Sequence, residues 1–238
     1  MATFVLVHGA MHGGWCWRDV HRRLSQRGHD VHNPSLTGQG DRRAGLTPEL
    51  GVETHVQDLD ELLWFEDLSD VHLVLHSYAG VLAGAVAERA ADRLASVVYL
   101  GAFVTSPGES LLDVEPTEVA ERYRRQVADE GDGWFLPASD AFLEQWGIEE
   151  ARRAWVGARL TDFPFRCQVE PTEFDPGPLE RLRKVYVAHT SPPLPSLGRF
   201  AEAARAAGWE THEIASGHDM MLAAPDATAD LLEHIALG

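Results

Sequence analysis

Short runs of apolar, often β-branched residues alternate with amphipathic stretches along most of the chain, and this alternation limits the possible folds more than any other feature. Runs such as residues 3–8 (TFVLVH) and 71–76 (VHLVLH) are largely apolar, which is typical of strands buried on both faces of a sheet. Residues 52–65 instead carry apolar residues on one helical face. We therefore predict an α/β fold, with a mostly parallel sheet of about six strands flanked by helices.

Glycine and proline mark the ends of several of these elements, because Gly28 is a natural helix stop and Pro34 ends a strand. The predicted strands are residues 3–8, 29–33, 71–76, 94–103, 184–188 and 210–215. The predicted helices are residues 15–27, 52–65, 78–91, 196–207 and 225–236.

The alternation stops after the fourth predicted strand. Residues 110–165 are rich in aromatic residues and contain no convincing strand, but they have helical patches at about 116–130, 139–146 and 149–160. We expect this block to be a helical cap over the carboxyl edge of the sheet, where ligands of such sheets bind. Residues 1–109 and 166–238 then form the core. Trp134 is the cap aromatic that we place in the substrate pocket; the alternative is that such aromatics fill the cap's own core.

Composition excludes several classes of function. The formal net charge of −17 disfavours nucleic acid and anionic membranes as partners. Two cysteines, Cys16 and Cys167, are too few for a disulfide framework. No apolar run approaches the ~20 residues that span a bilayer, and the first residues lack a signal-peptide pattern, so we expect a cytoplasmic protein. A small-molecule substrate is the expected partner, and a homodimer stays open.

Metal and cofactor sites are not expected. The twelve histidines are scattered without metal-ligand spacing. The HGAMHGG segment lacks both the P-loop lysine and the dinucleotide-binding spacing.

Ser77 stands directly after a predicted strand and directly before a helix rich in small residues. Such a turn lifts the hydroxyl above the sheet, as in a nucleophile elbow. Leu75 and Ala79 occupy the two positions where glycine usually relieves crowding, and Leu75 should press on its neighbours or reshape the turn. The alternative is an ordinary serine N-cap.

His218 lies on the loop between the last strand and the last helix, so it can approach Ser77 at the carboxyl edge. A neutral imidazole there can take the serine proton and return it to a leaving group. The glycine turn after His8 can aim a backbone N–H at the same place. We predict the N–H groups of Ala10 and Tyr78 as oxyanion donors, and His8 as a pocket residue.

Five segments in this order resemble the α/β-hydrolase superfamily, and more narrowly its small esterase and hydroxynitrile-lyase branch. They are HGAMHGGWCW, LTGQGDR, VLHSYAG, VVYLGAFVTSPGES and SGHDMMLAAPDATADLL. They look most like bacterial relatives of plant salicylate-ester esterases. The resemblance implies the α/β-hydrolase fold with a helical cap and a serine–histidine–acid triad. In it, Ser77 matches the nucleophile and His218 the base.

The triad acid is where this chain departs from the family. The acid usually follows the strand at residues 184–188, but residues 189–195 (HTSPPLP) contain no carboxylate. Some relatives place it near the position of Gly101, which offers none either. Glu109 is the nearest remaining carboxylate on that loop and is our candidate acid, with a solvated or helix-capping role as the alternative. Asp219 adjoins His218, and adjacency does not normally give the orienting hydrogen bond.

We therefore predict a cofactor-independent serine hydrolase acting on a small apolar or aromatic carboxylic ester, thioester or lactone. The missing acid keeps a second hypothesis open: a lyase or cyclase on a polyketide-like substrate, with His218 as acid and base. A third is a binding protein that has lost catalysis. Hydroxynitrile lyase activity itself is not expected, because Gly9 and Asp219 replace the threonine and lysine of that branch. The distance from His218 to the nearest carboxylate discriminates between the first two.

Overall fold

A computed structural model describes the backbone of residues 1–238 and every side chain except that of residue 195. Six strands form one sheet in the order β2-β1-β3-β4-β7-β8, and all neighbouring pairs are parallel. The strands are β1 (Thr3–Val7), β2 (Asp30–His32), β3 (Val71–His76), β4 (Leu94–Leu100), β7 (Arg183–His189) and β8 (Glu210–Ile214). The predicted fold class is confirmed, with strand ends moved by a few residues.

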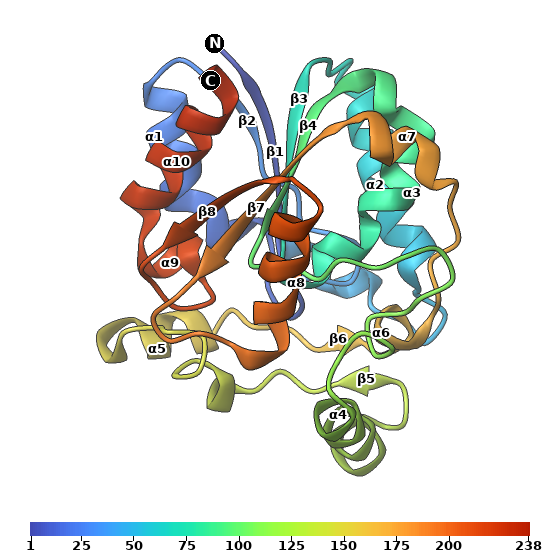
Figure 1. Cartoon of the computed structure of the whole chain (residues 1–238). Coiled ribbons are helices and arrows are strands. Elements are labelled where there is room, and N and C mark those ends of the chain that lie inside the picture. Colours follow the sequence, from blue (N-terminus) through green and yellow to red (C-terminus); the bar gives the residue numbers. More distant parts are fainter.

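Helices cover both faces of this sheet (Figure 1). The face with α1 (Arg18–Gln26) and α10 (Pro225–Leu237) buries residues such as Phe4 and Leu6. The opposite face, with α2 (Val52–Phe65), α3 (Ala83–Ala90) and α8 (Pro195–Ala206), buries the alternate residues Val5 and Val7. Since both faces of β1 are buried, its sequence is apolar throughout rather than alternating. No helix in the described part of the chain combines the length and apolarity that crossing a membrane requires.

The chain leaves the sheet after β4 and crosses beyond the carboxyl ends of the strands before it returns at β7 (Figure 1). This segment contains α4 (Thr117–Glu130), β5 (Phe135–Leu136), α5 (Glu150–Gly157), β6 (Phe163–Pro164), α6 (Arg166–Val169) and α7 (Pro176–Arg181). The predicted patches at 116–130 and 149–160 match α4 and α5. The boundaries of the cap at residues 110 and 165 stay a prediction.

Two expectations about this segment are wrong. β5 and β6 pair as an antiparallel two-stranded sheet of two residues each, with α5 between them in the chain. Strands this short do not produce an alternating pattern. The predicted helix at 139–146 shrinks to a 3₁₀ turn at Asp140–Phe142, followed by turns that end in Gly147 at φ +81°.

Candidate active site

Ser77 occupies a strained turn at the carboxyl end of β3. Its φ is +55°, in the left-handed region that residues other than glycine seldom adopt. It opens a 3₁₀ turn, Ser77–Leu82, whose N-cap is His76, so the N-cap alternative for Ser77 is wrong. Leu75 is buried within the sheet, where it pairs in register with Val7 and Tyr99. The turn therefore has the geometry of a nucleophile elbow despite lacking both usual glycines.

Two other glycines make room for the elbow. A side chain on Gly80 would overlap the carbonyl oxygen of Phe103, whose own N–H donates to the carbonyl of Ser77 at 3.1 Å. A Cβ on Gly9 would lie 2.8 Å from the Cβ of Ser77. Glycine at these positions lets the loops after β1 and β4 approach the nucleophile closely.

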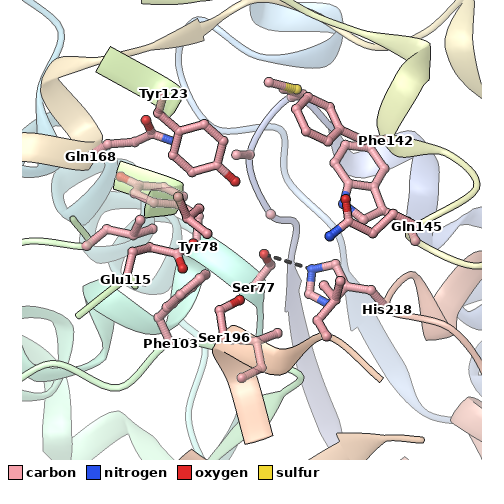
Figure 2. Close-up of a pocket in the computed structure, with 18 of the residues that line it drawn as sticks. Ser77, Tyr78, Phe103, Glu115, Tyr123, Phe142, Gln145, Gln168, Ser196 and His218 are labelled. Atoms are coloured by element: carbon pink, nitrogen blue, oxygen red, sulfur yellow. Dashed lines mark hydrogen bonds between the residues drawn. The ribbon is translucent and has the colours of Figure 1, made fainter. Parts of the chain in front are cut away.

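His218 reaches Ser77 as predicted. Its Nε2 lies 3.0 Å from the Ser77 Oγ, across 141 residues of sequence (Figure 2). The loop that carries His218 is fixed beneath the cap, since a side chain on Gly217 would overlap the backbone of Gly147. The N–H of Asp219 also donates to the carbonyl of Trp146 at 3.1 Å. A hydroxyl within hydrogen-bond reach of a buried imidazole is the arrangement that general-base activation requires.

No carboxylate among the described residues completes this pair. The Nδ1 of His218 is buried and has no hydrogen-bond partner in the part of the chain that the structure describes. The prediction that Glu109 is the acid is wrong: its Oε2 accepts from the N–H of Ser106 at 2.7 Å, three residues away. The Glu109 carboxylate therefore stabilises the turn formed by residues 106–109. A Cβ on Gly101 would lie 3.5 Å from His218 Nδ1, so the position where some relatives carry the acid does face the base here.

Two neutral imidazoles flank His218 instead of an acid. The rings of His76 and His189 have their centroids 4.6 Å and 5.0 Å from the His218 ring. His76 Nε2 donates to the His218 carbonyl at 3.0 Å, and His189 Nε2 accepts from the N–H of Leu194 at 3.1 Å. Burial lowers the pKa of both flanking rings to about 4. Burial, followed by these neighbours, also lowers the pKa of His218 well below its usual value, so His218 is neutral and weakly basic.

A buried ion pair lies beside this row. The carboxylate of Asp219 is fully buried, and its Oδ2 lies 3.1 Å from His12 Nε2. The other ring nitrogen of His12 faces the carbonyl of Ala10 at 2.8 Å. Although burial alone would lower it, the charge of Asp219 raises the pKa of His12. With an acceptor at each nitrogen, His12 carries a proton on both and is a cation.

A further cluster, which no sequence pattern indicated, brings a ring nitrogen of His76, one of His218 and a carboxylate oxygen of Asp219 within 4.8 Å of one another. His76 donates to the His218 carbonyl and His218 bonds Ser77, while Asp219 pairs with His12. Each residue also keeps one buried atom without a partner in the described part of the chain, namely His76 Nδ1, His218 Nδ1 and Asp219 Oδ1. Because His218 Nε2 bonds Ser77 and the proposed chemistry needs that imidazole free to take a proton, we assign the cluster to the electrostatics of the active site rather than to a metal.

A cavity of about 90 Å³ opens above Ser77 and His218. Its lining is mainly apolar, with a few polar side chains. The apolar members include Phe103, Leu111, Val119, Leu136, Phe142, Trp146, Leu194 and Leu197, and the polar ones include Glu115, Arg122, Tyr123, Gln145, Gln168 and Ser196. Such a site suits a small, largely apolar ligand with a few polar groups.

Two predicted pocket residues do not line the cavity. His8 is buried below it, where its Nε2 accepts from the N–H of Leu36 at 3.0 Å and burial lowers its pKa to about 3. Trp134 packs against Phe135 at the start of β5, with ring centroids 4.9 Å apart. The cap instead contributes Phe142 and Trp146, whose rings stack at 5.4 Å. Their spacing of four residues was the signal that could have found them.

Ala10 and Tyr78 both line the cavity next to Ser77, and their role as oxyanion donors stays a prediction. The side chain of Tyr78 is anchored behind the site: its hydroxyl lies 2.9 Å from His55 Nδ1, and His55 Nε2 donates to the carbonyl of Thr37 at 2.9 Å. Asp58 in turn accepts from Thr37. This chain of hydrogen bonds ties the LTGQGDR loop to the residue after the nucleophile, and no sequence pattern indicated it.

Comparison with known proteins shows the family to which the chain belongs. The family model described as "Alpha/beta hydrolase family" matches residues 4–231. A carbendazim hydrolyzing esterase of Nocardioides sp. is 34% identical over 242 residues, covering 98% of both chains. Methylesterase 7 of Arabidopsis thaliana is 34% identical over 103 residues, 42% of this chain and 40% of its own. The structure of an extracellular alpha/beta-hydrolase from a Paenibacillus species superposes with a TM-score of 0.86 at 20% identity, covering 98% of both chains.

Proposed function

Because the chain belongs to the alpha/beta hydrolase family and is a carboxylic ester hydrolase, we propose that Ser77 and His218 hydrolyse small, apolar or aromatic esters by way of an acyl-enzyme. Thioesters and lactones fall within the same chemistry. The observation that carries the proposal is the 3.0 Å contact between Ser77 Oγ and His218 Nε2 at the base of a mainly apolar cavity. No cofactor takes part in the proposed steps.

In the first step Ser77 attacks the ester carbonyl while His218 Nε2 takes its proton. The oxyanion that forms would be held by the N–H groups of Ala10 and Tyr78, each such donor contributing about 3–4 kcal/mol to the transition state. His218 then returns the proton to the leaving alcohol. Water, deprotonated by the same nitrogen, attacks the acyl-enzyme and releases the acid and Ser77.

Because His218 Nδ1 has no partner among the described residues, His218 should be a weak base, which limits the substrates that react well. In serine proteases, loss of a working acid lowers turnover about 10⁴-fold, because the imidazolium is neither oriented nor stabilised. Here His218 is oriented by packing between His76 and His189 and by its rigid loop. We expect it to be a weak base, so esters with good leaving groups should react best. The relative named a carbendazim hydrolyzing esterase supports ester hydrolysis as the reaction.

The same bare nitrogen favours one second candidate, a lyase or cyclase that uses His218 as acid and base without an acyl-enzyme. Labelling by a fluorophosphonate probe separates the two chemistries. Rapid labelling at Ser77 supports hydrolysis, whereas resistance under conditions that label ordinary esterases supports the alternative.

The direct test is Ser77→Ala, assayed on a panel of aryl and methyl esters. Ser25→Ala, an exposed serine on α1, is the matched control. We expect Ser77→Ala to lower kcat about 10³-fold or more, with the control unchanged. Full esterase activity in Ser77→Ala would refute the proposal.

A cytoplasmic location and a homodimer remain proposals. Cys16 and Cys167 are both buried and unpaired, which suits a reducing compartment. Cell fractionation tests the location, and sedimentation tests the oligomeric state.

A further inference from the structure

Glu115 is a carboxylate that the proposed reaction does not use, although it lies in the same pocket. It stands just before α4, in the cap, and lines the cavity together with Ser77. Its exposed fraction is 9%. Figure 2 shows it on the side of Ser77 away from His218. A carboxylate in a mainly apolar wall costs free energy, so it requires a physical reason.

The surroundings of Glu115 leave part of its hydrogen-bonding capacity unused. Its Oε2 is buried without a partner among the described residues. Burial raises the pKa of Glu115 to about 7, although Arg199, Arg122 and the hydroxyl of Ser196 favour the charged form. Tyr123 faces it from α4, and His218 stands across the cavity.

A second acceptor lies in the same lining. Gln168 is buried, and its Oε1 also has no partner among the described residues. Both groups therefore offer oxygen lone pairs that the protein itself does not satisfy, on a wall that is otherwise mainly hydrophobic. A ligand with an N–H group can satisfy such oxygens, whereas an ether or hydrocarbon group cannot.

Building on the proposed ester hydrolysis, we propose that Glu115, with Gln168 in the same cavity lining, selects esters whose aromatic portion carries an N–H donor. Glu115 acts here as a specificity residue and takes no part in bond making at the carbonyl. Sites that hydrogen-bond a substrate N–H discriminate against analogues without it, because the buried partner is then left unpaired. We expect a preference of about 10–100-fold in kcat/KM.

The preference should depend on pH in a defined direction. Above about pH 7 Glu115 is a carboxylate and accepts from N–H, and below it the acid is protonated and loses part of this capacity. Burial raises the pKa of Tyr123, so its hydroxyl stays neutral across this range. His218 titrates at lower pH and affects both kinds of substrate equally. The ratio of the two kcat/KM values should therefore rise as pH increases through about 7.

The test compares methyl indole-3-carboxylate with methyl benzofuran-3-carboxylate, which has the same shape but an oxygen in place of the N–H. We expect the wild-type protein to prefer the indole ester at pH 8, and Glu115→Leu to bring the ratio close to one while benzofuran hydrolysis is retained. Glu115→Gln should keep part of the preference but lose its pH dependence. Glu118→Gln, an exposed residue on α4, is the matched control and should match the wild type.

The outcomes separate this inference from the proposed function. A Glu115→Leu variant that keeps the indole preference, or that loses activity on both esters equally, overturns the specificity role. Equal rates on both esters in the wild type overturn it too, while ester hydrolysis stands. If the wild type hydrolyses neither ester and Ser77 resists fluorophosphonate, the proposed hydrolysis itself fails and the inference falls with it.

Discussion

Gly101→Asp should install the carboxylate that the catalytic pair lacks. A Cβ at this position would lie 3.5 Å from His218 Nδ1 and 3.1 Å from His189 Nδ1. Because Leu194 donates to His189 Nε2, the proton of neutral His189 sits on Nδ1. An aspartate at position 101 would then meet two N–H donors, one from each ring, at about 2.7–3.2 Å.

The expected changes in kcat and in unfolding free energy on Gly101→Asp follow from opposing effects. The φ of Gly101 is +52°, where aspartate costs about 1 kcal/mol relative to glycine. The flexible end of Met220, which would lie 3.1 Å from the new Cβ, must move slightly. A working acid is worth about 10⁴-fold in kcat, and an imperfectly placed one should recover part of this. We expect kcat to rise about 10²–10³-fold, at a loss of about 1–2 kcal/mol in unfolding free energy.

The assay is the pH profile of kcat/KM on an aryl ester. In the wild type the acid limb should lie below about pH 6.5, because the pKa of His218 is lowered by burial. The new carboxylate should raise that pKa and move the limb to higher pH. Gly101→Asn is the control, with the same shape and no charge. Equal activity in both variants, or an acid limb that stays in place, would refute the argument that the missing acid limits this enzyme.

Three further predictions follow from neighbouring features. Gly9→Ala, which sets a Cβ 2.8 Å from that of Ser77, should lower kcat about 10²-fold and cost about 1–3 kcal/mol in unfolding free energy; unchanged kcat contradicts it. Tyr78→Phe leaves His55 Nδ1 with only the weak thiol donor of Cys167, 3.7 Å away, and should lower the unfolding free energy by about 1–2 kcal/mol in urea titrations, with an unchanged midpoint as the contrary result. The unfolding free energy should fall as the pH is lowered from 6.5 to 5, by about 1–2 kcal/mol for each histidine whose folded pKa lies near 3–4. The reason is that these histidines bind a proton in the unfolded chain but stay neutral in the folded protein. Urea titrations at the two pH values check this, and equal midpoints would contradict it. These histidines are His8, His55, His76 and His189, and the raised pKa of His12 opposes the trend only weakly.

The catalytic pair was predictable because topology alone brings it together. Ser77 ends one parallel strand and His218 follows another, and the carboxyl ends of parallel strands share one edge. The apolar strands were predictable for a related reason, since burial on two faces removes polar residues from the sequence. Such features depend on backbone arrangement more than on the fit of particular side chains.

The remaining site residues depend on local packing that the sequence does not express. Glu109 failed as the acid because a backbone N–H three residues away is a nearer partner than any distant imidazole. Trp134 failed as a pocket residue because it precedes a strand of two residues, too short to show a periodic pattern, and its ring packs against Phe135. The pairing of His12 with Asp219 spans 207 residues. No residue pattern indicates which loops of the cap and core will meet.

The close backbone approach of Gly147 and Gly217 couples the cap to the loop that carries the catalytic base, His218. The N–H of Asp219 also donates to the carbonyl of Trp146. The part of the cap around Trp146 and Gly147 therefore cannot move outward without pulling the imidazole of His218 away from Ser77. We therefore expect a molecule arriving from solvent to pass on the side of α4, away from these contacts between the cap and the loop of His218. If the cap opened on the side of Gly147, His218 would lose its contact with Ser77, and the enzyme would be inactive while the cap stayed open.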